Sequence, residues 1–373
     1  MKENGYTIVE NVLSIDECNT GREHFFKWIE GFGINEATRH NLTESKFRDS
    51  TIANKHGIVE YPPSGISEPA VYGRTRPGVS KTFAQLYGCN PEDLITSLDR
   101  IQIGIGSGKD QPSPTADADA EPKTYKKGKG RGTRLVPSWA HTDQDSRSRG
   151  LQCIQGSVTF GDISDNGGSL FVLEKSHLYH DKLFQKMDAL NKNIKDEKKK
   201  LVHNKKNWVK LPSELDNWMI NECGCTPRVI RPVKAGSMLL WDSRLIHANV
   251  PPTDTSIRLV TYICMLPRKW VESAPRNQII RKREAFLGAR TTSHWPSMLI
   301  VFSDGAPFRN QHFDKEKCAK YAKKYTDPEE RLKTIVKFLE NEFSEDPTRY
   351  REIVRHVGFS DLADYKKAVA KYL

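Results

Sequence analysis

The sequence lacks the features of a membrane protein and of a disulfide-linked secreted protein. No run of eighteen apolar residues occurs among its 373 residues, so we expect no membrane-spanning helix. The segment Met1–Tyr6 has no apolar stretch of the kind a signal peptide needs, which favours a cytoplasmic or nuclear location over secretion. Cysteines number seven and form no CxxC pair, so we expect reduced thiols and no zinc site of the paired-CxxC type.

Acidic residues are scarce in two parts of the chain. Residues 121–134 hold six Lys or Arg residues against one acid, and residues 181–210 hold ten lysines against four acids. These surpluses account for the whole net charge of +11. A local excess of positive charge suits an anionic partner, such as a phosphate on a substrate or on a nucleic acid. The ordinary alternative is a solvated lysine-rich surface, which we favour.

Three potential metal ligands occur in His141-Thr142-Asp143 and in His247, about a hundred residues later. Residues 137–143 are predicted to form a strand, and alternate residues of a strand point to the same side. His141 and Asp143 would therefore face one metal ion. His247 would arrive at the far end of a second apolar strand that begins at Gly236. Two histidines and one carboxylate bind iron(II) on one face and leave the opposite positions open, so the sequence predicts an iron(II) site.

Arg258 is a candidate for binding an anionic co-substrate. It follows His247 by eleven residues and lies in the strand-like segment 256–264. A guanidinium buried in the mouth of a barrel needs an anion, and a dicarboxylate would supply one through paired hydrogen bonds.

In this order, these elements resemble the iron- and 2-oxoglutarate-dependent dioxygenases of the phytanoyl-CoA dioxygenase family. The resemblance also rests on the opening segment 4–18 and on the run from Asn166 to Ser176-His177, and it covers residues 4 to 268. It implies a mainly β fold, a double-stranded β-helix or jelly-roll core with added N- and C-terminal helices. It also implies Fe(II), with 2-oxoglutarate and O2 as co-substrates.

The resemblance further implies the reaction and the ligands. His141, Asp143 and His247 would bind iron, and Arg258 would bind the distal carboxylate of 2-oxoglutarate. The co-substrate would leave as succinate and CO2 while a small organic substrate is oxidised. Related halogenases have a small residue in place of the carboxylate ligand, so Asp143 favours hydroxylation over halogenation.

Four further polar residues are predicted to line the co-substrate site. The resemblance implies Asn249 and Gln102, whose places match residues that contact the co-substrate in the family, and strand alternation adds Gln155 and Thr159. For each residue the alternative is a place in a polar wall without contact to the co-substrate. Asn249 lies two residues after His247, and Gln155 and Thr159 lie on the polar face of the alternating segment 151–160. His177 is interpreted as structural, and residues 294–296 as a structured corner, with closure of the substrate pocket as the alternative.

The predicted domain organisation is a dioxygenase domain over residues 1–268, followed by a helical extension over residues 269–373 packed on the core. Within the first, residues 107–134 are expected to form a mobile loop and residues 177–225 an insertion. The extension contains an amphipathic helix, because its apolar residues recur at helical spacing: Leu332, Ile335, Val336, Leu339 and Phe343.

Two alternative functions remain open on the sequence. One is an oxygenase that modifies a nucleic acid or another phosphate-bearing macromolecule. The other is a non-catalytic jelly-roll binding protein. The His-x-His pattern of cupin-type isomerases is absent.

Overall fold

The computed structural model describes the parts of the chain given by these ranges: 1–31, 53–54, 56–59, 63–106, 135–204, 207–274, 277–302 and 326–372. The predicted loop 107–134 lies outside the described residues, and with it the basic segment 121–134. Among the described residues, no helix is both long and apolar enough to cross a membrane.

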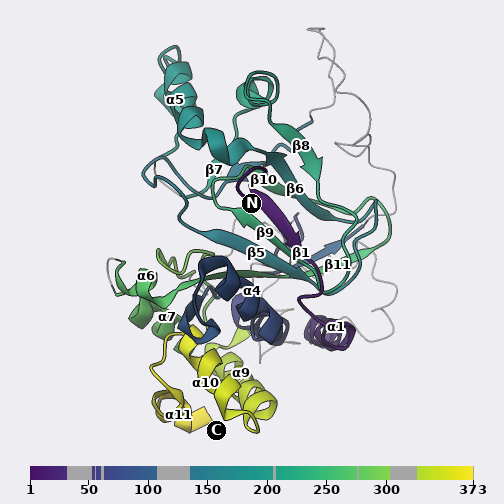
Figure 1. The fold of residues 1–373 in the computed structure, drawn as a ribbon, viewed down its shortest axis with the longest axis vertical. Helices are drawn as coiled ribbons and strands as arrows, with labels where there is room; N and C mark the ends of the chain where they lie inside the picture. The colour runs from purple at the N-terminus through teal and green to yellow at the C-terminus, as the bar shows by residue number, and fades with distance from the viewer. Residues whose placement is uncertain are drawn as a thin grey trace.

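Two antiparallel sheets form the centre of the molecule (Figure 1). The first has the order β1 (Tyr6–Val9), β9 (Met238–Asp242), β5 (Ile154–Thr159), β11 (Ile257–Pro267) and β2 (Leu94–Thr96), with β3 (Ile101–Ile105) also paired to β11. The second has the order β7 (Val209–Lys210), β4 (His141–Thr142), β10 (His247–Val250), β6 (Ser169–Glu174) and β8 (Thr226–Val229). The predicted mainly β jelly-roll core with flanking helices is confirmed.

The strand predicted over residues 137–143 is shorter than expected. Residues 137–140 form a turn closed by the Ala140 N–H, which donates to the Pro137 carbonyl. Because this turn occupies residues 137–140, the ladder begins only at His141. Asp143 follows the strand and is held by a backbone hydrogen bond from its own N–H to Ser243 O.

The prediction of one apolar strand from Gly236 to His247 is wrong. The segment divides into β9 in the first sheet and β10 in the second. A turn separates them, in which the Leu245 N–H donates to Asp242 O and the Arg244 side chain pairs with the Asp242 carboxylate at 2.6 Å. The chain therefore crosses between sheets before it presents His247.

Helices cover the outer face of the first sheet. Helix α1 (Ile15–Glu30) begins with a capping box, in which Ser14 and Glu17 bond each other's backbone N–H groups. Helices α3 (Glu68–Arg74) and α4 (Pro77–Tyr87) follow. Phe25 and Phe83 of these helices share one hydrophobic cluster with Val158 and Phe160 from the apolar side of segment 151–160. The opposite, polar side of β5 is thus turned toward the second sheet.

The tail is helical and shares a core with the jelly roll. Its helices are α6 (Arg268–Glu272), α7 (Gln278–Leu287), α9 (Pro328–Phe343), α10 (Pro347–His356) and α11 (Leu362–Val369). The predicted apolar face of α9 is buried, and its cluster includes Ile66, Val71 and Leu98. Helices α9, α10 and α11 lie at the opposite end of the molecule from α5 (His180–Asn191) (Figure 1). Segment 177–225 contains α5 and also strand β7, which extends the second sheet beside β4.

Candidate metal centre

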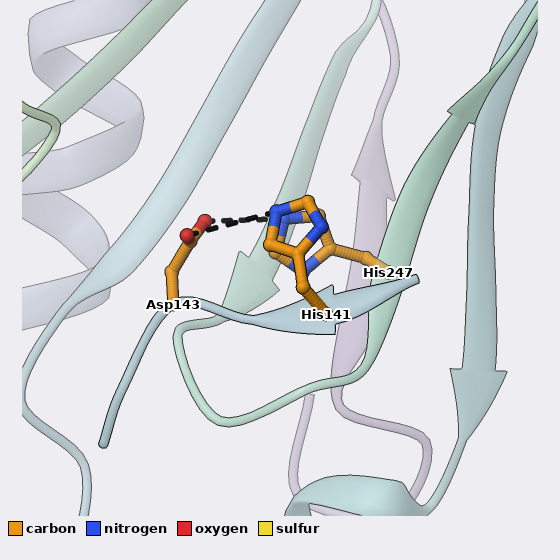
Figure 2. Close-up of side chains that lie close together, drawn as sticks. All are labelled: His141, Asp143 and His247. Atoms are coloured by element: carbon orange, nitrogen blue, oxygen red, sulfur yellow. Dashed lines mark ion pairs between the residues drawn. The ribbon is translucent and has the colours of Figure 1, made fainter. Parts of the chain in front are cut away.

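The structure brings the three predicted ligands together at one buried point (Figure 2). His141 Nε2 lies 3.6 Å from Asp143 Oδ1, and His247 Nε2 lies 3.2 Å from Asp143 Oδ2. Among the described residues, this is the one group of His, Cys, Asp and Glu whose ligand atoms all lie within 4.8 Å of one another. All three side chains are buried.

Strand pairing and backbone hydrogen bonds orient the two imidazoles. His141 and His247 are direct partners in the β4–β10 register, and their ring centroids lie 4.5 Å apart. Each Nδ1 lies 2.9 Å from the carbonyl two residues earlier, Trp139 O for His141 and Leu245 O for His247. A proton on each Nδ1 satisfies these carbonyls and leaves both Nε2 atoms unprotonated, which is the form that binds a metal.

The electrostatics of the site also suit a cation. Burial lowers the pKa of His141 to about 4, against the opposing effect of Asp143, so this ring is neutral at neutral pH. Burial alone would raise the pKa of Asp143, but His294, His141 and His247 outweigh it and hold that pKa well below its usual range. Gln155 Nε2 donates to Asp143 Oδ2 at 2.9 Å and fixes the carboxylate. Two imidazoles and one carboxylate are a chemically suitable ligand set for iron(II).

A buried chain of hydrogen bonds runs from Arg258 across the polar side of the sheets. Arg258 Nη1 donates to Asn249 Oδ1 at 3.0 Å, and Asn249 Nδ2 donates to the Tyr262 hydroxyl at 2.6 Å. The hydroxyl in turn donates to Gln102 Oε1 at 2.6 Å, and Gln102 Nε2 donates to His56 O. This network holds one edge of the guanidinium in place.

The other edge of the Arg258 guanidinium has no protein partner. Nε and Nη2 are buried and make no hydrogen bond to a described residue, although the residue is only 3% exposed. Burial lowers the pKa of Arg258, but a guanidinium stays charged in proteins. A buried cation with two free donors is costly unless an anion binds it. The arrangement therefore suits a carboxylate ligand.

The remaining predicted residues lie as follows. Thr159 is buried on β5, and its hydroxyl donates to Gly161 O, so its predicted contact with a co-substrate stays a prediction. His177 Nε2 lies 3.1 Å from Lys2 O and belongs to the packing of the N-terminal segment.

Sequence reasoning did not assign three residues that the structure places beside the centre. Tyr262 lies on the same side of β11 as Arg258, so strand alternation from Arg258 could have indicated it. Trp208 is 47% exposed and its ring centroid lies 5.1 Å from that of His141. His294 Nε2 lies 3.8 Å from Asp143 Oδ2, although the corner 294–296 was interpreted as structural. Closure of the substrate pocket was the alternative for the corner of His294, whereas nothing in the local sequence marks Trp208.

Comparisons with known proteins give distant relatives. No family model matches the chain. Ava biosynthesis cluster protein O from Aspergillus versicolor is 23% identical over 302 residues, which cover 80% of this chain and 84% of that protein. Among solved structures, the chain is similar to SnoK, a non-heme alpha ketoglutarate dependent carbocyclase from nogalamycin biosynthesis (14% identity, 71% of this chain and 79% of that chain, TM-score 0.36). It is also similar to EctD from S. alaskensis, solved with 2-oxoglutarate and 5-hydroxyectoine (14% identity, 70% of this chain and 72% of that chain, TM-score 0.40).

The resemblance found in the sequence, the jelly-roll fold and the buried His-Asp-His cluster thus agree. The chain resembles the iron- and 2-oxoglutarate-dependent oxygenases and has the two-histidine, one-carboxylate ligand set expected of them.

Proposed function

We propose that the protein is an Fe(II)- and 2-oxoglutarate-dependent oxygenase that hydroxylates a small organic substrate with release of succinate and CO2. The observation that carries this proposal is the buried cluster of His141, Asp143 and His247, whose ligand atoms all lie within 4.8 Å of one another. Iron(II) held there would supply the chemistry that activates O2.

The ligand side chains are prepared for the metal before it binds. The carbonyls of Trp139 and Leu245 keep the Nδ1 protons in place, so both Nε2 atoms face Asp143 as acceptors. Gln155 binds Oδ2 of the carboxylate and limits its rotation. Because three residues occupy only one face of an ion, the opposite face is left for 2-oxoglutarate and O2.

Arg258 is the proposed anchor for the distal carboxylate of 2-oxoglutarate. Its unpartnered Nε and Nη2 form the edge that accepts a carboxylate through two parallel hydrogen bonds. Asn249 and Gln102 support this role, since with Tyr262 they fix the guanidinium through a continuous network. Thr159 is retained as a candidate contact on the same face.

A small molecule is favoured over a nucleic acid as the substrate. Within the described part of the basic segment 181–210, Lys199 and Lys200 form ion pairs with Asp196 and Glu197 of the same turn. Such local pairing of exposed side chains fits the interpretation of these lysines as a solvated surface. An anionic group on the small substrate remains part of the proposal, as does a cytoplasmic location, with the nucleus as the alternative, which the cysteine usage supports.

The proposed catalytic unit is residues 1–268, with residues 269–373 as an extension that supports it. The cluster around α9 supports the packing of this extension on the first unit, because it includes Ile66, Val71 and Leu98 of that unit.

The function can be tested by a screen for substrate-stimulated succinate release. Purified protein is supplied with Fe(II), 2-oxoglutarate and O2 and is then incubated with pools of small metabolites, including CoA thioesters. We expect at least one pool to raise succinate formation above the substrate-free rate, and His141→Ala protein to form none. Succinate formation that persists unchanged in the His141→Ala protein would contradict the proposal.

A further inference from the structure

His294, a residue of the tail, lies at the metal centre. Its Nε2 is 3.8 Å from Asp143 Oδ2, and it is the largest of the charge effects that lower the pKa of Asp143. The side chain is 25% exposed, but Nε2 itself is buried and has no hydrogen-bond partner among the described residues. A distance of 3.8 Å is too long for a hydrogen bond to the carboxylate.

The loop that carries His294 is firmly held. Thr292 N–H donates to Leu98 O at 2.8 Å, and the Leu98 N–H donates back to Thr292 Oγ1 at 3.0 Å. Ser293 and Ile300 close the loop with hydrogen bonds between Ser293 N–H and Ile300 O and between Ile300 N–H and Ser293 Oγ. The next residue, Trp295, is 1% exposed and packs in a cluster beneath the first sheet. The position of His294 beside Asp143 is therefore set by the fold and not by a flexible side chain alone.

His294 does not belong to the ligand cluster itself. The group of ligand atoms that all lie within 4.8 Å of one another consists, among the described residues, of His141, Asp143 and His247. His294 approaches Asp143 but not the whole set. The His294 ring therefore lies outside the set of three ligands. Its Nε2 is nevertheless buried close to them, and a buried polar atom needs a hydrogen-bond partner.

We propose that His294 Nε2 forms a hydrogen bond to a small ligand, such as water or O2, that occupies the open face of the iron centre next to Asp143. This inference rests on the proposed function, because it requires iron to be held by the triad. It extends the functional unit beyond residue 268, since a tail residue would then complete the site. Nε2 would donate to O2, which can only accept a hydrogen bond, whereas water can accept from Nε2 or donate to it.

The test uses nitric oxide and azide as probes of the open face. Three proteins are loaded with Fe(II) and 2-oxoglutarate under anaerobic conditions: the wild type, His294→Ala and His294→Gln. A fourth protein, His24→Gln, serves as the control, because His24 packs against Tyr72 of α3 and Phe338 of α9. We expect the electron paramagnetic resonance signal of the nitric oxide complex to change its rhombicity in His294→Ala. Loss of a hydrogen bond to a charged ligand should also weaken azide binding about tenfold. His294→Gln should recover part of both effects, and His24→Gln should match the wild type.

Two results would overturn the inference. One is a His294→Ala protein whose nitric oxide signal and azide affinity equal those of the wild type. The other is a His294→Ala protein whose Fe(II) affinity falls by more than about tenfold, which is the usual effect of losing a residue that supports a metal ligand. His294 would then be a determinant of metal binding instead. A wild-type protein that binds no Fe(II) would refute the proposed function itself, so the two failures are distinguishable.

Discussion

At the scale of single residues, the site depends on a few hydrogen bonds that hold the side chains in the orientation and tautomer that bind a metal. The Nδ1 contacts of His141 and His247 select the tautomer, and Gln155 holds Asp143. The ligands themselves were predictable, because residue type and spacing encode them. Gln155 was predicted to face inward by strand alternation, but its target, Asp143, was visible only in the structure.

Replacement of Gln155 tests how much the support of Asp143 contributes. We expect Gln155→Ala to weaken Fe(II) binding by about 10- to 100-fold, the usual effect of losing a partner that orients a metal ligand. Isothermal titration with Fe(II) under anaerobic conditions measures this. Thr159→Val is the matched control, because Thr159 lies on the same strand but bonds Gly161 O. Equal affinities in Gln155→Ala and wild type would show that the contact is not needed.

Replacement of Arg258 tests the proposed anchor for the co-substrate. We expect Arg258→Ala to weaken 2-oxoglutarate binding at least tenfold, since losing one partner of a buried charged contact costs ~2–5 kcal/mol. Iron binding should persist, because Arg258 is not one of the clustered ligands. Arg268→Ala is a suitable control, as Arg268 pairs with the half-exposed Glu272 at 2.9 Å. Unchanged co-substrate affinity in Arg258→Ala would remove the proposed role.

At the scale of elements, the sequence predicted which segments form strands, but it predicted the ends of those strands less well. The alternation in residues 151–160 correctly separated the buried apolar side of β5 from its polar side. The prediction failed at Gly236–His247, because an apolar run carries no information on which sheet each half joins. The Asp242-Ser243-Arg244 turn decides that, through contacts of Asp242 with Arg244 and Leu245.

The contact between α10 and the segment before β2 predicts an acid-sensitive stability. His356 is buried on α10, and its Nε2 lies 2.7 Å from Pro91 O. Burial lowers the pKa of His356 to about 4, opposed by the Glu352 carboxylate, whereas the unfolded value is 6.5. The neutral ring thus stabilises the fold fully above pH 6.5, and this stability is lost as the pH falls toward 4. Between pH 6.5 and 5 we expect a loss of about 2 kcal/mol from this group.

Urea unfolding of the metal-free protein at pH 7.5 and pH 5 measures this loss. The His356→Gln protein should lose about 2 kcal/mol less on acidification than the wild type, whatever its stability at pH 7.5. Equal losses in the two proteins would show that His356 does not titrate as its burial requires.

At the scale of the whole molecule, the tail is part of one structure with the jelly roll. The sequence predicted α9 from its periodicity, and its apolar face is buried as expected. The residues against which the tail packs could not be predicted, because the sequence around Ile66, Val71 and Leu98 shows no pattern that indicates α9 as their partner. The approach of His294 to Asp143 was hidden for the same reason, since 151 positions separate the two residues in the sequence.

A cavity in the tail core should therefore destabilise the whole protein. Ile335 is 1% exposed in the cluster that joins α9 to the jelly roll. We expect Ile335→Ala to lower the free energy of unfolding by ~2–5 kcal/mol, the range for truncating a large buried aliphatic side chain. One cooperative transition, shifted to lower temperature for both circular dichroism and tryptophan fluorescence, is the expected result. Separate transitions would show that the tail unfolds independently. Lys337→Ala, an exposed change on the same helix, should have little effect.

The most direct test of the central claim is anaerobic titration of the wild-type protein with Fe(II), followed by 2-oxoglutarate. The account predicts one Fe(II) per chain, a visible absorption band when 2-oxoglutarate is added, and loss of both in His247→Ala. An unchanged stoichiometry and an unchanged band in His247→Ala would contradict the assignment of His141, Asp143 and His247 as the iron site.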